Sequence, residues 1–85
     1  MARRMRAVYY RDRQGREPVN DYIEALPVTV QSEIDWHIDL LNHLNENDPP
    51  LTFPYSSQIE GELRELRCKH GRRLYRVLYR RSRSL

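Results

Sequence analysis

The segment GELRELRCKHGRRLYRVLYRR, residues 61–81, constrains the fold most strongly, because its residues alternate in the manner of a β-hairpin. We expect strands over about 62–69 and 72–80, joined by a turn at KHGR. The alternation places these residues on one face: Leu66, Cys68, Tyr75, Val77 and Tyr79. It leaves Arg67, Lys69 and Arg76 on the other face, together with Glu65. A slip of one residue in either strand would exchange the two faces.

Upstream of the hairpin, the sequence pattern predicts one strand and two helices. MRAVYYRD (5–12) is rich in β-forming residues and is expected to form a first strand. PVNDYIEAL (18–26) begins with a proline that suits the first turn of a helix, and a longer helix restarts after Pro27. Residues 46–62 contain three prolines and several small polar residues, which predicts an irregular loop.

The resulting order, β-α-α-β-β, predicts one α+β domain over residues 1–85, with two helices on one face of a mainly antiparallel sheet. A single cysteine, Cys68, excludes an intramolecular disulfide and fits a reducing compartment. No apolar run approaches the roughly 20 residues that a membrane helix needs. We therefore expect a cytoplasmic protein that does not bind membranes.

Charge is sorted along the chain. Residues 1–16 hold six arginines and one acid, residues 17–63 hold ten acids and no lysine or arginine, and residues 64–85 hold nine basic residues and one acid. Fourteen of the fifteen basic residues are arginine, whose planar fork can bind two phosphate oxygens, although codon bias in a GC-rich genome would also favour arginine over lysine. Codon bias would not sort the charges. The pattern favours a phosphate-binding surface, most simply for RNA, over ordinary solubilising side chains.

Other candidate residues have simpler explanations. Tyr79 could donate a proton, but its place in the alternation favours core packing. His70 titrates in a useful range, yet it falls in the predicted turn, and His37 and His43 lie on an acidic helix where structural or solvated roles are more common. Trp36 is expected to anchor the core. The chain has no metalloprotease, paired-cysteine, P-loop or nucleophile-elbow motif, so we expect neither a metal nor a cofactor.

Four motifs, in this order and spacing, resemble the RelE/HigB-like toxins of bacterial and phage toxin–antitoxin modules, in particular the phage-derived branch of that superfamily. They are GREPVNDYIEALP, the long helix after the proline, PYSSQIEGELRELRCKHG and YRVLY, and the resemblance spans about residues 6–80. It implies a fold similar to that of microbial ribonucleases. The implied activity is that of a metal-independent mRNA endonuclease (an mRNA interferase) that cuts mRNA on the ribosome, inhibits translation and is neutralised by a cognate antitoxin.

The resemblance also implies roles for particular residues. Arg67, at the end of ELR, and Arg76, in YRV, correspond to ligands of the phosphate and of the transition state, and Lys69 to a further basic contributor. The chemistry is attack of a ribose 2′-hydroxyl on the adjacent phosphate, which needs a proton acceptor, a proton donor and cations for the developing charge.

The chain departs from the family after YRVLY. Relatives continue into another turn and a last strand that supplies further catalytic or RNA-contacting residues, whereas RRSRSL follows here, as in a domain shortened at its C-terminus. A missing strand would leave a sheet edge unpaired and open to a homodimer partner or an antitoxin segment. The expected alternatives are thus an active mRNA interferase and a catalytically impaired toxin-like module that binds RNA, an antitoxin or itself. An independent DNA-binding role ranks last, because both helices are acidic.

Overall fold

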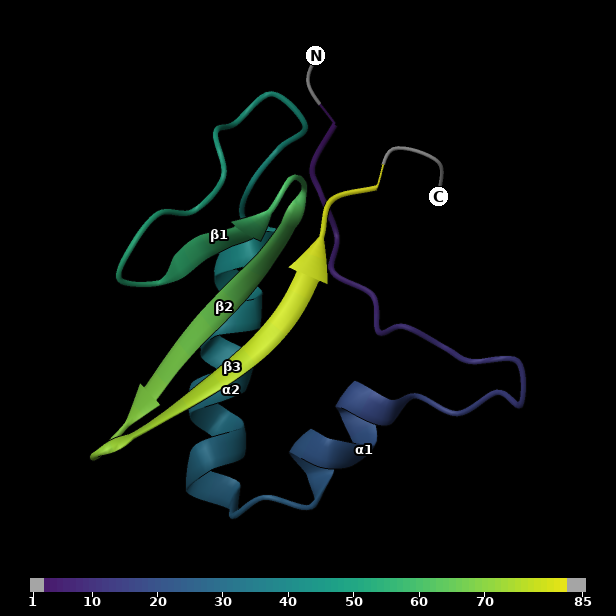
Figure 1. Ribbon diagram of the computed structural model, residues 1–85, viewed down its shortest axis with the longest axis vertical. Helices are drawn as coiled ribbons and strands as arrows, with labels where there is room; N and C mark the ends of the chain where they lie inside the picture. The colour runs from purple at the N-terminus through teal and green to yellow at the C-terminus, as the bar shows by residue number, and fades with distance from the viewer. Residues whose placement is uncertain (1–2, 83–85) are drawn as a thin grey trace. The chain divides into compact units, whose positions relative to one another are not determined.

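The computed structural model describes residues 3–82, which form two helices followed by three strands (Figure 1). The elements are α1 (Pro18–Glu24), α2 (Val28–Asn42), β1 (Ser56–Glu60), β2 (Leu63–His70) and β3 (Arg73–Arg80). The protein therefore has the predicted α+β fold. The chain divides after Asp48 into two compact units, which we call the helical unit and the sheet unit. The helices belong to one unit and the sheet to the other. The arrangement in which the helices cover one face of the sheet therefore stays a prediction.

In the helical unit, prolines set where each helix begins. Pro18 occupies the first turn of α1, where its missing N–H costs no hydrogen bond, and Pro27 precedes α2 with an extended backbone (ψ 147°). The side-chain amide of Gln31 donates to the backbone oxygens of Glu24 (3.1 Å) and Leu26 (2.8 Å), and so ties the first turn of α2 to the end of α1. The corner between the two helices is therefore closed by side-chain hydrogen bonds.

The buried side of α2 is a narrow stripe of three side chains among the described residues. Val30, Ile34 and His37 are buried at helical spacings of four and three, whereas Trp36 is 52% exposed. The prediction that Trp36 anchors the core is therefore wrong: Trp36 precedes His37 by one residue, which rotates it away from the buried stripe. Its ring instead meets the His37 ring edge-on, with the centroids 5.0 Å apart.

The predicted first strand over residues 5–12 is absent, so the order of elements is α-α-β-β-β rather than β-α-α-β-β. Just before these residues, Arg4 forms an isolated antiparallel β-bridge with Asn45, which follows α2 in the chain. A further hydrogen bond joins the backbone N–H of Ala7 to Oδ1 of Asn42 (2.7 Å). β-forming residues favour a half-buried pleated surface but do not specify a partner strand, and here these residues do not form a ladder.

The loop predicted over residues 46–62 is interrupted by β1. This short strand runs antiparallel to β2, with Ser56 opposite Leu66 and Ser57 opposite Glu65, and its register shifts between Gln58 and Glu60. The sequence SSQIE lacks the alternation that marks a strand, so the pairing with β2 overrides a weak local preference. The sheet order β1-β2-β3 makes β2 the central strand.

The β2–β3 hairpin confirms the predicted strands, faces and register. Leu66 lies opposite Val77, Cys68 opposite Tyr75, and Arg67 opposite Arg76. Gly71, in the two-residue turn, has φ +62°, a conformation that other residues rarely adopt and that matches the twist of the strands. Leu66 and Cys68 are 1% and 0% exposed. We call their side of the sheet the Leu66 face and the opposite side, with Arg67, Lys69 and Arg76, the Glu65 face.

A partly buried polar network on the Leu66 face ties the loop before β1 to the sheet. The hydroxyls of Ser56 and Tyr79 lie 2.7 Å apart, Nε of Arg64 donates to the Ser56 hydroxyl (3.3 Å), and Nη2 of Arg64 donates to the backbone oxygen of Leu51 (2.7 Å). Ser56 is completely buried. The Tyr79 hydroxyl therefore serves the packing of the sheet unit, as the sequence favoured.

Replacing Tyr79 by phenylalanine is expected to lower the free energy of unfolding by about 1 kcal/mol, since one buried hydrogen bond is lost while Arg64 still satisfies Ser56. Urea denaturation measures this change. Tyr75→Phe is the matched control, because the Tyr75 hydroxyl forms no hydrogen bond with the described residues. Equal stability of the two variants would show that the Ser56–Tyr79 contact contributes nothing.

Candidate active site

A buried carboxylate, that of Glu65, lies at the centre of the Glu65 face between two arginines. Its residue is 6% exposed. Oε2 accepts hydrogen bonds from Nη1 of Arg67 (2.8 Å) and from the hydroxyl of Ser57 (2.9 Å). Oε1 faces Nε of Arg76 at 3.6 Å. Each of these three partners comes from a different strand: Ser57 lies on β1, Arg67 on β2 and Arg76 on β3.

These contacts keep Glu65 ionised. The hydrogen bond from Arg67, then that from Ser57, hold the pKa of Glu65 below its ordinary value of 4.5 despite burial, and the charges of Arg76 and Arg67 lower it further. At neutral pH the group is therefore a carboxylate, with one oxygen bonded twice and the other directed toward a cation.

The two arginines that the sequence singled out are cross-strand partners, yet their surroundings differ. The side chain of Arg67 is only 21% exposed, because it pairs with Glu65 and stacks on the ring of Phe53, 4.9 Å from the ring centroid. The side chain of Arg76 is 60% exposed. The guanidinium of Arg76 is thus open to solvent, while that of Arg67 is bonded to the carboxylate and largely shielded.

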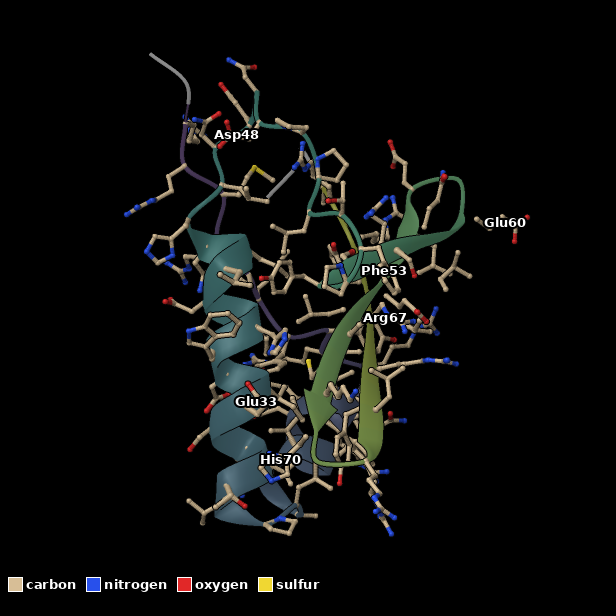
Figure 2. The ribbon with its side chains drawn as sticks, turned by 90° about the vertical axis from the view of Figure 1, so that its left-hand side faces the viewer. Glu33, Asp48, Phe53, Glu60, Arg67 and His70 are labelled. Carbon is tan, nitrogen blue, oxygen red and sulfur yellow. The ribbon has the colours of Figure 1, made fainter. Side chains whose placement is uncertain are left out.

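Lys69 lies two residues beyond Arg67 on the same face of β2 and is exposed, opposite Leu74. His70 is the last residue of β2 rather than part of the turn, and it projects at the hairpin end of the strand, away from Arg67 (Figure 2). His70 and Tyr79 both belong to the opposite side of the sheet from Glu65. The structure therefore brings Arg67, Arg76 and Lys69 to one face and leaves His70 and Tyr79 outside it.

Glu65 is the functional candidate that the sequence prediction passed over. The alternation placed it on the cationic face, but its role depends on Ser57, whose strand was not predicted. A signal was present nevertheless, since Glu65 is the one acid in residues 64–85. A lone carboxylate within a basic segment is expected to be paired.

Folding should depend on the ionisation of Glu65 in a predictable direction. Because its pKa is lower in the folded chain than the ordinary 4.5, the stabilisation is complete well above pH 4.5 and is lost as the pH falls through the folded-state value. Urea unfolding at a series of pH values should show a steeper loss below pH 4.5 for the native chain than for Glu65→Gln. Glu62→Gln, at an exposed acid in the turn before β2, is the control. Parallel curves for the native chain and Glu65→Gln would contradict this effect.

Within residues 3–82, no group of three or more histidine, cysteine or acidic side chains could hold a metal ion. Neither α1 nor α2 is long and apolar enough to cross a membrane.

Two helices followed by a three-stranded antiparallel sheet form an α+β fold that is compatible with the RelE-like arrangement. Residues 21–82 match the family described as Phage derived protein Gp49-like (DUF891), from within α1 to just beyond β3. The chain belongs to this family. No curated protein and no solved structure matches it.

Proposed function

We propose that the protein is the toxin of a type II toxin–antitoxin module and acts as an mRNA interferase, an endoribonuclease that cleaves mRNA on the ribosome and so inhibits translation. The observation that carries the proposal is the Glu65 carboxylate, ionised and held between Arg67 and Arg76 on one face of the sheet. Membership of the Gp49-like family supports the toxin–antitoxin context and a cognate antitoxin as partner.

In the proposed reaction, Glu65 is the general base. Oε2 is occupied by Arg67 and Ser57, so Oε1 is the oxygen with a lone pair available to take the proton of a ribose 2′-hydroxyl. The 2′-oxygen then forms a bond to the adjacent phosphorus, and the bond from phosphorus to the 5′-oxygen of the next nucleotide breaks. The products are a 2′,3′-cyclic phosphate and a free 5′-hydroxyl.

The three basic side chains on this face have different roles in the proposed reaction. Arg76 binds the non-bridging phosphate oxygens and stabilises the charge that develops on them, since it is exposed and lies beside Oε1. Arg67 is a positioning residue that orients Glu65 and keeps it ionised. The ammonium of Lys69, farther along the same face, is the proposed donor of the proton to the departing 5′-oxygen. The basic residues of 64–85 attract the polyanion, so binding should weaken steeply with salt.

A second function, that of a catalytically impaired module which binds RNA, an antitoxin or itself, is favoured by two observations. Arg67 is largely shielded and bonded to Glu65, as in an ion pair that only stabilises the sheet. In addition, β1 and β3 each pair on one side only within the part of the chain that the structure describes, which leaves edges for an added strand.

Expression of the chain in bacteria without an antitoxin separates the two functions. The interferase should arrest growth and cut a translated transcript while sparing the same transcript without its start codon, and the double variant Arg67→Ala/Arg76→Ala should relieve the arrest. Arrest that is unchanged in the double variant would remove the proposed site. A harmless native chain that still binds RNA would favour the binding module.

A further inference from the structure

Phe53 is an exposed aromatic ring fixed at the candidate active site. It is 70% exposed, although the guanidinium of Arg67 lies against one face of the ring, 4.9 Å from its centroid. Figure 2 shows the two side chains close together beside β2. An exposed phenylalanine alone is ordinary, but this one rests on the side chain that holds the proposed general base.

The loop that carries Phe53 is anchored to the sheet on both sides of the ring. Before it, the backbone oxygen of Leu51 accepts from Arg64, and after it, the backbone oxygen of Tyr55 accepts from the N–H of Arg67 (2.8 Å). Within the loop, the N–H groups of Tyr55 and Ser56 donate to the oxygen of Thr52 (3.0 and 3.1 Å). The ring is therefore held in place by the same strand that carries Glu65.

We propose that Phe53 is a stacking platform for an unpaired nucleobase next to the phosphate that is cleaved. This inference rests on the proposed ribonuclease function and adds the substrate class, single-stranded RNA with an unstacked base. With one ring face on Arg67, the other is available, and every base presents a flat π-surface to it. Because Arg67 contacts both Phe53 and Glu65, a base on the ring belongs to a nucleotide at or beside the reacting one.

Binding of short single-stranded oligoribonucleotides, made uncleavable by 2′-O-methyl groups, tests the platform without relying on catalysis. Phe53→Leu should weaken binding by about tenfold, since a base–aromatic stack is lost, while Phe53→Trp should retain it. The salt dependence of binding should be unchanged in Phe53→Leu, whereas Arg76→Ala should reduce its slope by about one phosphate contact. Tyr22→Leu, at a 55% exposed aromatic residue on α1, is the matched control and should bind as the native chain does.

An abasic substitution moved along the oligoribonucleotide identifies the stacked base. At one position, the abasic substitution should weaken binding to the native chain by about as much as Phe53→Leu weakens binding of the normal oligoribonucleotide. At that same position, the abasic substitution should not weaken binding to the Phe53→Leu variant any further, because the stack is already lost. Fluorescence gives a second readout: the emission of Phe53→Trp, made in a Trp36→Phe background, should be quenched by the normal oligoribonucleotide and not by the abasic one.

The outcomes separate the two proposals. A native chain that binds none of the oligoribonucleotides would overturn both the ribonuclease and the platform. Native-like binding by Phe53→Leu, or an equal loss in Tyr22→Leu, would overturn the platform alone. Phe53-dependent binding by a chain that never cleaves RNA would support the platform and contradict the ribonuclease.

Discussion

The variant Glu65→Gln is expected to cleave RNA about 10²- to 10⁴-fold more slowly than the native chain, which is the usual contribution of a positioned general base. The glutamine side chain has nearly the same shape, and its oxygen can still accept from Arg67 and Ser57. It cannot take a proton from the 2′-hydroxyl. Single-turnover cleavage of a labelled transcript in a translation extract measures the rate, and RNA binding should be almost unchanged.

Glu62→Gln is the control for this prediction, since it removes the same charge from an exposed position outside the site. It should cleave at the native rate. A Glu65→Gln variant that is folded and fully active would show that Glu65 only stabilises the sheet, and the base would have to be sought elsewhere.

Arg76→Ala is expected to reduce cleavage by about 10²- to 10³-fold, as when a charge-stabilising donor is removed from a transition state. The loss should appear mainly in kcat, because the charge on the phosphate oxygens grows as the 2′-oxygen attacks. Arg76→Lys keeps the charge without the planar fork and should recover only part of the rate. Arg76→Ala should also raise the pKa of Glu65 toward its ordinary value, since the nearby charge of Arg76 lowers it.

Arg73→Ala supplies the comparison for Arg76→Ala, because both arginines are exposed on β3 but alternate to opposite faces of the sheet. Both variants lose one positive charge, so a general electrostatic effect would slow them equally. A specific phosphate ligand at Arg76 predicts a large loss in that variant and a small one in Arg73→Ala.

The hairpin could be predicted from the sequence because local and long-range signals agree there. Leu66 and Cys68 alternate with charged residues, Gly71 supplies the turn, and YRVLY alternates in step. The short turn then leaves little freedom in register, so the pairing of Arg67 with Arg76 follows.

The strand predicted over residues 5–12 and the loop predicted over residues 46–62 were both wrong in part, because both predictions relied on composition alone. Residues 5–12 have β-forming side chains without a strand partner, and SSQIE is a strand with side chains that carry no strand pattern. In both cases pairing decided the outcome, and pairing depends on residues distant in sequence.

The same limit applies to the candidate site. The sorted charges indicated Arg67, Arg76 and Lys69, which do lie on one face. The sequence could not indicate that Ser57 and Phe53 lie beside them. The placement of these two side chains depends on β1 and on the loop before it, and that strand was not predicted. The difference between a shielded Arg67 and an exposed Arg76 likewise arises from that packing.

The chemistry of the cut RNA ends is the most direct test of the central claim, that Glu65 and Arg76 promote attack by the 2′-hydroxyl. Mass spectrometry of the fragments should show a 2′,3′-cyclic phosphate on one side and a 5′-hydroxyl on the other. A single 2′-deoxynucleotide at the cleavage position should abolish the cut. Fragments ending in a 3′-hydroxyl and a 5′-phosphate, or cleavage that persists at the 2′-deoxynucleotide, would contradict this account.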